Sequence, residues 1–284
     1  MPKPEFEVVA QGVITPEGPA EDARGNLYFV QRSLGKVSVV CGSAVHDVVD
    51  TGGKPQSVAV ESSGSLLVPD AIRKALLRVT AGGGLQTLCD HCGDSPLRGP
   101  NDLVPLPGGG ALVTDPGMDF ALPGAVLWID PTGDAYLLTN AMSFPNGIAL
   151  HQDGRTLLVA ESARDRIEEF QWRQATVSRR RTFAQLPEGS GPDGIALDSE
   201  GSLYVVCHFT GRVLMLDPAG RVVDVLWPGG SHPTNCTFGG PDFKSLYVTE
   251  DEAGHIVRFR RDVCGQVAYS RSQPRTLGKW SNSP

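Results

Sequence analysis

The sequence predicts an all-β protein, a six-bladed β-propeller that residues 1–284 form as a single domain. Three observations predict it. One motif recurs six times at spacings of 39 to 47 residues, and the repeats contain about four short apolar runs each. Glycine (34 residues) and proline (22 residues) make up about a fifth of the chain. Such punctuation indicates many turns and short strands, and a period near 45 with four strands per unit is typical of a propeller blade.

The repeated motif consists of a proline, a polar residue, an apolar triplet, a glycine turn and an apolar strand that ends near an acid. It is clearest in residues 145–162, 192–207 and 100–115, and looser in residues 55–70, 16–30 and 234–250. Eight residues after the polar residue, five copies have a turn glycine, and the sixth has Phe243 instead. Five matches in register make a chance similarity improbable and support the repeat.

Strand prediction within the repeats also suggests how the ring closes. The fourth repeat contains four predicted strands, GIAL, TLLVAE, IEEFQW and RTFAQL, whereas the sixth contains only CTFG, SLYVTE and HIVRFR. The N-terminal segment FEVVA precedes the first repeat and has no partner there. We expect this segment to supply the missing strand of the last blade, because that pairing removes an exposed sheet edge.

Composition excludes several classes of function. The chain has 25 basic and 32 acidic residues, a net charge of −7, which argues against nucleic-acid binding. No apolar run approaches the roughly 18 residues of a membrane span, and the N-terminus has no signal-peptide pattern. We therefore expect a cytoplasmic protein with reduced cysteines. The outer strands show no apolar stripe, so we expect a monomer or a weak dimer.

The polar residue of the motif is the most informative position. In a propeller it recurs at the same place on each innermost strand, so the six copies would form a ring around the tunnel mouth. These residues are Glu17, Gln56, Asn101, Asn146, Asp193 and Asn235. All six carry a side-chain oxygen, which favours a hard divalent cation, Ca²⁺ first and Mg²⁺ or Mn²⁺ next, with Zn²⁺ less favoured. The alternative is that these residues simply open strands after a turn.

Several strings in the chain resemble the senescence-marker-protein/gluconolactonase family, also called regucalcin-like. They are PEGP (16–19), GPNDL with TDPG (99–103 and 114–117), FPNGIAL with DGRTLLVAES (144–162), GPDGIALDSEGSLYV (191–205) and TNCTFGGPDFKSLYVTE (234–250). The resemblance covers nearly the whole chain. It implies a six-bladed propeller with one divalent metal ion at the tunnel mouth. Many members are lactonases, and a related branch hydrolyses organophosphates.

The resemblance also implies site residues. The metal ligands of the family fall on Glu17, Asn146 and Asp193, and its blade-three asparagine, which contacts substrate or metal, falls on Asn101. A family arginine two residues before that asparagine corresponds only loosely to Arg98, which lies three residues before it. The aromatic-rich stretch that follows TDP in the family reads here as Gly117, Met118, Asp119 and Phe120. This departure concerns the substrate pocket and not the metal ligands.

A cation at this site would polarise a lactone carbonyl and lower the pKa of a bound water. Asp193 is the candidate general base, and Asn101 would position the substrate. Arg98, Phe120, Phe144 and His208 are further candidates for substrate contacts. No G-x-S-x-G nucleophile motif occurs, so a serine mechanism is not indicated.

Three functions stay open at this point. The first is a metal-dependent lactonase that acts on a small molecule such as a sugar lactone. The second is a metal-dependent enzyme of a specialised pathway, or an organophosphate hydrolase, with a non-sugar substrate. The third is a non-enzymatic calcium-binding propeller. Met118 and Phe120 favour a partly apolar substrate.

Overall fold

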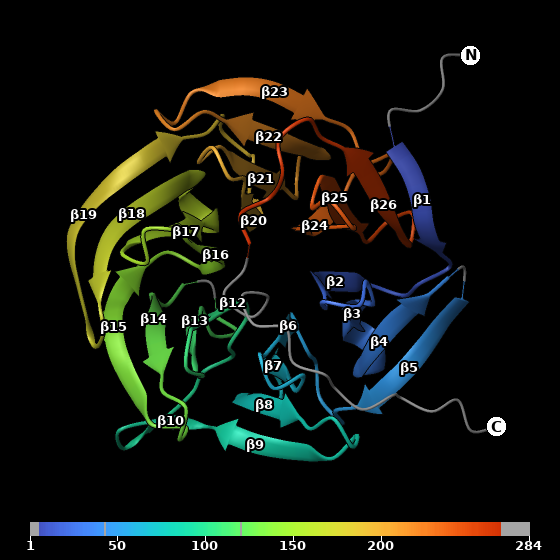
Figure 1. Ribbon diagram of the computed structural model, residues 1–284. Coiled ribbons are helices and arrows are strands. Elements are labelled where there is room, and N and C mark those ends of the chain that lie inside the picture. Colours follow the sequence, from blue (N-terminus) through green and yellow to red (C-terminus); the bar gives the residue numbers. More distant parts are fainter. Residues whose placement is uncertain (1–5, 43, 120, 268–284) are drawn as a thin grey trace, which may run out of the picture.

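The computed structural model describes residues 6–42, 44–119 and 121–267. Their strands form six four-stranded sheets and one two-stranded sheet, and all pairing is antiparallel. The six larger sheets surround a central axis as blades, with β2, β6, β12, β16, β20 and β24 innermost (Figure 1). The predicted six-bladed β-propeller is therefore confirmed.

Each of the first three blades follows chain order from the axis outward. Blade 1 comprises β2 (Pro16–Glu21), β3 (Leu27–Gln31), β4 (Lys36–Cys41) and β5 (Ala44–Asp50). Blade 2 comprises β6 (Ala59–Val60), β7 (Leu66–Asp70), β8 (Ala75–Val79) and β9 (Leu85–Cys89). Blade 3 comprises β12 (Leu103–Pro105), β13 (Ala111–Asp115), β14 (Gly124–Ile129) and β15 (Ala135–Met142). Between blades 2 and 3 lies a small hairpin of β10 (His91–Cys92) and β11 (Ser95–Pro96).

The remaining blades keep the same order, except that the last one is completed from the N-terminus. Blade 4 comprises β16 (Pro145–Leu150), β17 (Thr156–Glu161), β18 (Arg166–Arg173) and β19 (Thr176–Gln185). Blade 5 comprises β20 (Pro192–Leu197), β21 (Leu203–Cys207), β22 (Arg212–Leu216) and β23 (Val222–Leu226). Blade 6 comprises β24 (Pro233–Gly239), β25 (Ser245–Glu250), β26 (His255–Arg260) and β1 (Phe6–Gln11). Two short 3₁₀ helices, η1 (Arg32–Leu34) and η2 (Ser162–Arg164), follow the second strands of blades 1 and 4.

Closure of the ring occurs as the sequence predicts. Strand β1 pairs antiparallel with β26, and Phe6 lies opposite Phe259. The two rings pack edge to face with their centroids 5.7 Å apart. The N-terminal strand therefore becomes the outermost strand of blade 6 and joins the two ends of the propeller in one sheet.

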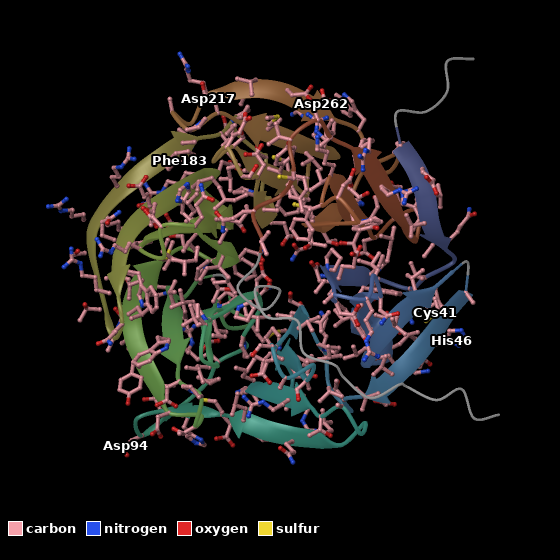
Figure 2. The ribbon with its side chains drawn as sticks, viewed as in Figure 1. Cys41, His46, Asp94, Phe183, Asp217 and Asp262 are labelled. Atoms are coloured by element: carbon pink, nitrogen blue, oxygen red, sulfur yellow. The ribbon has the colours of Figure 1, made fainter. Side chains whose placement is uncertain are left out.

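The core lies between neighbouring blades. The second strand of a blade is buried on both faces, because each face packs against another blade, and β13 and β21 are buried at every residue. One cluster joins blades 4 and 5 through Leu158 and Ile195, among others. The outer part of each blade carries exposed side chains instead, such as Cys41 at the end of β4 and His46 on the outermost strand β5 (Figure 2). Fully burying one aliphatic side chain of this kind contributes about 1.5–3 kcal/mol.

The exceptional Phe243 keeps the turn that glycine forms elsewhere. The N–H of Gly64 donates to the carbonyl of Glu61 at 2.8 Å, and the N–H of Phe243 donates in the same way to that of Gly240 at 3.1 Å. Phe243 has a φ of 61°, in the left-handed region that favours glycine. Its ring packs against the cluster between blades 5 and 6, and this packing offsets the backbone cost.

All six cysteines are free thiols, as expected. The thiol of Cys89 donates to the carbonyl of His91, and that of Cys92 to the carbonyl of Ala135. Across the described ranges, no helix has the length and apolar character needed to cross a bilayer.

Candidate metal centre and pocket

A pocket of about 540 Å³ opens at one end of the central axis. Five of the six predicted ring residues line it, namely Glu17, Gln56, Asn101, Asn146 and Asp193. They come from five different blades, so the repeat brings together side chains that are far apart in the sequence.

Bulges in the innermost strands hold these side chains. The pairing of β16 with β17 shifts register between Pro145 and Ile148, and Asn146 lies within that shift. The pairing of β20 with β21 shifts in the same way between Pro192 and Ile195, around Asp193. A bulge frees a residue from the ladder and re-aims its side chain, and here it does so at the tunnel mouth.

Close approach of the inner strands explains the glycine that follows several ring residues. A Cβ at Gly147 would lie 2.2 Å from the carbonyl oxygen of Asp193, and one at Gly194 would lie 2.1 Å from the side chain of Asn235. Real Cβ atoms do not come that close to other atoms, so these positions require glycine. The motifs PNG and PDG thus combine a ring side chain with a residue that lets the next blade pack against it.

The prediction that Asn235 completes the ring is wrong. Pro233 pairs with Glu250 as Pro145 pairs with Glu161, so Thr234 is the residue equivalent to Asn146. The hydroxyl of Thr234 donates to the carbonyl of Pro16 at 2.9 Å. The stretch from Pro233 to Glu250 is one residue longer than its counterpart in blade 4. Counting eight residues back from the turn at Phe243 therefore selects Asn235, one residue after the equivalent position.

Asn235 lies one layer deeper in the tunnel, where it joins two carboxyl groups. Its side chain hydrogen-bonds to both Glu17 and Asp102. Asp102 is buried and accepts the N–H of Leu103 at 2.9 Å, and burial raises its pKa to about 6. Sequence reasoning missed Asp102, although it directly follows Asn101 where three other repeats have glycine.

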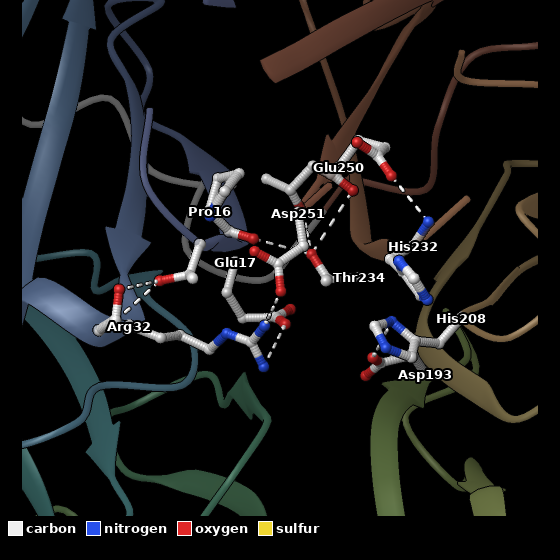
Figure 3. A network of polar contacts seen from close by, with 12 residues as sticks. Pro16, Glu17, Arg32, Asp193, His208, His232, Thr234, Glu250 and Asp251 are labelled. Carbon is white, nitrogen blue, oxygen red and sulfur yellow. Dashed lines mark hydrogen bonds and ion pairs between the residues drawn. The ribbon is translucent and has the colours of Figure 1, made fainter. Parts of the chain in front are cut away.

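Two carboxyl groups, that of the buried Glu17 and that of the half-buried Asp193, face each other across the tunnel mouth (Figure 3). Glu17 is 4% exposed, and its Oε1 accepts the N–H of Gly18 at 3.0 Å. Burial raises the pKa of Glu17 to about 7, and the Arg32 guanidinium, with Nη1 3.9 Å from Oε2, opposes that rise. Burial and then the charge of Glu17 raise the pKa of Asp193 well above its usual range. Both shifts show that this site favours an added positive charge.

The contacts of Asn146 test whether the residues at this site fit a metal ion. Its side chain hydrogen-bonds to Asp193, while its Oδ1 is buried and has no hydrogen-bond partner. A buried acceptor without a donor needs a water or a cation. Two carboxylates and an amide oxygen are ligands that suit a hard cation such as Ca²⁺, so the residues fit a divalent metal. This set includes only two carboxylates. Within the described part of the chain, no group of three or more His, Cys, Asp and Glu side chains could hold a metal ion.

His208 lies beside the carboxylate of Asp193. Its Nδ1 is 3.1 Å from the carbonyl oxygen of Pro233 and 3.9 Å from Oδ2 of Asp193. The ring also contacts those of Phe209 and His232, each with its centroid 5.1 Å away. Burial lowers the pKa of His208, which favours the neutral form of its ring.

The remaining predicted substrate contacts divide into three cases. Phe144 and Asn101 line the pocket. Arg98 does not belong to the lining, because its Nη1 donates to the carbonyl of Pro123 at 2.5 Å and its N–H to Asp115. Phe120 lies outside the described residues.

A second ring of lining residues was missed except for His208, which is among the predicted substrate contacts. This ring consists of the residue that directly follows the second strand of each blade. Five of the six such residues line the pocket: Arg32, Ala71, Pro116, Ser162 and His208. The sixth, Asp251, accepts a hydrogen bond from Nη2 of Arg32 at 2.6 Å. The signal was present in the repeat, since these residues occupy one fixed position after an aligned strand.

The last residue of the second strand supports both rings. In blades 2, 3, 4 and 6 it is an acid that accepts backbone N–H groups from the segment before the innermost strand. Examples are Asp70 with the N–H of Lys54 at 2.8 Å and Glu161 with that of Ser143 at 2.6 Å. Gln31 does the same in blade 1 for the N–H of Ile14. These residues hold the loops that carry the ring side chains.

Comparison with known proteins gives consistent relatives. The model of a family described as the SMP-30/gluconolactonase/LRE-like region matches residues 15–251. Regucalcin of Xenopus laevis is 30% identical over 130 residues, which is 44% of this chain and 44% of that protein. The match thus spans less than half the length of this curated relative.

Solved structures share the fold over most of the chain. A gluconolactonase from Xanthomonas campestris has a TM-score of 0.79 and 24% identity, and the match covers 92% of this chain and 89% of that chain. A calcium-binding regucalcin from Agrobacterium tumefaciens has a TM-score of 0.82 and 19% identity, with 93% and 96% covered. At these identities the likeness shows the propeller architecture.

Proposed function

Because the chain belongs to the SMP-30/gluconolactonase/LRE-like family, we propose that it is a divalent-metal-dependent hydrolase of a small lactone, with Ca²⁺ as the first candidate metal and Mg²⁺, Mn²⁺ or Zn²⁺ as alternatives. The related gluconolactonase structure supports the reaction class, and the related calcium-binding regucalcin supports the metal. The single observation that carries the proposal is the unpaired, buried Oδ1 of Asn146 beside Asp193, across the tunnel mouth from Glu17.

In this proposal Glu17, Asn146 and Asp193 hold the metal at the base of the pocket. A bound divalent cation would polarise the lactone carbonyl and lower the pKa of a water molecule. The protein contributes the fixed geometry, because each ligand lies in or beside a strand bulge that packing against the next blade makes rigid.

Asp193 is the candidate proton acceptor for the attacking water. Its side chain is 14% exposed, against 5% for Glu17, so it is the more accessible of the two carboxylates. The neighbouring His208 is oriented by the carbonyl of Pro233, and when its Nδ1 donates that bond its Nε2 is an acceptor. Asn101 lines the same pocket and offers an amide that can orient the substrate.

The lining favours a lactone with apolar substituents over a sugar lactone. Met118, Phe144 and Phe209 line the pocket on the side of blades 3 to 5, and Met118 and Phe209 are exposed there. A sugar lactone would present hydroxyl groups to this apolar wall, where they would lose hydrogen bonds to water. The same wall supports the second candidate, a metal-dependent enzyme that acts on another non-sugar substrate such as an organophosphate.

A lactone panel with proton release as the readout tests the proposal. The protein is stripped with a chelator and reloaded with Ca²⁺, Mg²⁺, Mn²⁺ or Zn²⁺, and sugar lactones are compared with alkyl and aryl lactones. We expect turnover that needs metal and is greater for the apolar lactones. Efficient turnover of sugar lactones alone would contradict the assigned preference. Calcium binding without turnover of any lactone or organophosphate would instead indicate a binding protein.

A further inference from the structure

The charged side chains of the pocket are unevenly distributed around its wall. Both cationic lining residues, Arg32 and Lys54, come from blades 1 and 2, whereas the exposed apolar residues Met118 and Phe209 come from blades 3 and 5. We propose that Lys54 binds a carboxylate group that the substrate carries at a distance from its lactone ring. This inference rests on the proposed function and narrows its substrate class to anionic lactones.

The backbone of Lys54 is held firmly at the pocket wall. Its N–H donates to Oδ1 of Asp70 at 2.8 Å, and its carbonyl accepts Nε2 of Gln56 at 2.9 Å. Just before it, the N–H of Thr51 donates to the carbonyl of Gly35 at 2.7 Å, so the loop packs on the turn that carries Arg32. Two adjacent, packed turns therefore bring both cations to the same side of the pocket.

Among the described charged residues that line the pocket, Lys54 alone has no counter-charge, and the further carboxyl group of Asp102 lies one layer deeper beside Asn235. A divalent cation would be balanced by Glu17 and Asp193, and Arg32 is paired with Asp251 at 2.6 Å. Across the described residues, no carboxylate lies within 4.0 Å of the Lys54 ammonium, whereas Arg32 has two carboxylate neighbours. With the cation in place, Lys54 is the lining charge without a counter-charge. A half-buried lysine in that position attracts an anionic group of the ligand.

The shape of this charge favours a carboxylate. One ammonium is a point charge that matches a single negative charge, while a phosphate dianion would leave its second charge unpaired. The apolar lining from blades 3 to 5 would then accommodate the hydrocarbon part of the same molecule. We therefore infer a substrate with a lactone ring, an apolar portion and one free carboxylate.

Binding of simple carboxylates tests this inference without turnover. Isothermal titration calorimetry of the full chain with Ca²⁺ would compare glutarate, which has two carboxylates, with butyrate, which has one. The variants are Lys54→Met and, as a matched control, Lys244→Met, which removes the same charge beside the turn between β24 and β25. Circular dichroism and the melting temperature verify that both variants are folded.

We expect glutarate to bind the unaltered protein about tenfold more tightly than butyrate, as for one charge-assisted hydrogen bond. Lys54→Met should remove that difference and leave butyrate binding within about twofold, and Lys244→Met should change neither. Equal binding of the two ligands, or a glutarate advantage that survives in Lys54→Met, would overturn the inference. A Lys54-dependent glutarate advantage in a protein that hydrolyses no lactone would keep the carboxylate site and reject the lactonase. Hydrolysis of neutral lactones by a protein that binds glutarate no more tightly than butyrate would keep the lactonase and reject the carboxylate site.

Discussion

The two ends of the central tunnel are built by the same six inner strands but have opposite character. One end opens into the pocket of about 540 Å³ that carries Glu17, Asn146 and Asp193. The other end contains a cavity of only about 150 Å³, lined largely by aliphatic residues of the inner strands. The segment near the C-terminus crosses this second end, where the N–H of Gln266 donates to the carbonyl of Leu197 at 2.9 Å. We call the end with the larger pocket the open end and this one the closed end.

The difference follows from strand pairing. At the open end, the register of β2, β16, β20 and β24 shifts at or beside the ring residue, and the side chains are released from the ladder. Toward the closed end the same strands pair regularly, and their residues pack as core. We infer that the open end serves function at some cost in stability, while the closed end serves stability. Substitutions at the two ends should therefore have opposite effects.

The largest effect is expected from Asp193→Asn. The change keeps the size of the side chain but removes both a metal ligand and the candidate proton acceptor, so kcat/KM for the best lactone of the panel should fall by at least about 10³-fold. The metal-free variant should melt no lower than the unaltered protein, because a half-buried ionisable group beside Glu17 has been removed. Steady-state kinetics and differential scanning calorimetry would check both results. If Asp193→Asn kept its activity after the metal was added back, Asp193 would have no role in the reaction.

Glu17→Gln should weaken metal binding with a smaller effect on the folded state. Removing one of two ligand charges lowers the attraction for Ca²⁺, and we expect the Kd to rise roughly 10- to 100-fold. Calorimetric titration with Ca²⁺ measures this directly. Glu21→Gln is the matched control, because Glu21 lies in the wall of the closed-end cavity and caps the N–H of Gly240. A similar loss of affinity in the control would mean that the effect is not specific to the open end.

The pH dependence of stability should distinguish the metal-free from the calcium-bound protein. The pKa of Glu17 is about 7 in the folded metal-free protein, above its ordinary value of 4.5, so the folded state holds a proton that the unfolded state has lost. The unfolding free energy of the metal-free protein should therefore decrease as the pH rises from about 4.5 to 7. Calcium needs the ionised carboxylates, so its affinity should rise over the same range.

Thermal melts at pH 5.5 and pH 8, with and without Ca²⁺, give the comparison. We expect the calcium-induced rise in melting temperature to be larger at pH 8. An equal rise at both pH values would show that no carboxyl proton is displaced when the metal binds, against the electrostatics of Glu17 and Asp193.

The sequence predicts the fold well, because a propeller repeats one pattern and each repeat confirms the others. Five of the six ring residues follow from that pattern. The error at Asn235 has a physical cause. Strand pairing, and not the distance from a turn, decides which residues are equivalent, and one extra residue places Thr234 at the position equivalent to Asn146. Arg32 and Lys54 were missed because an arginine or lysine does not recur at the equivalent positions of the other blades, so the repeat does not point to their charge. Arg98 corresponds only loosely to the family arginine because it lies three residues before Asn101 and not two, and its guanidinium donates to the carbonyl of Pro123.

The smallest effect is expected at the closed end, from Gln266→Ala. The side chain of Gln266 accepts the N–H of Gln152 and donates to the carbonyl of Leu150, both at 2.7 Å, so it ties the segment near the C-terminus to blade 4. Losing two partly exposed hydrogen bonds should cost about 1–2 kcal/mol, a decrease of a few degrees in melting temperature for a chain of this size. The value of kcat/KM should stay within twofold, because no pocket residue contacts this side chain directly. A large loss of activity without a loss of stability would mean that the two ends are coupled through the tunnel, and the division between a functional and a structural end would then be wrong.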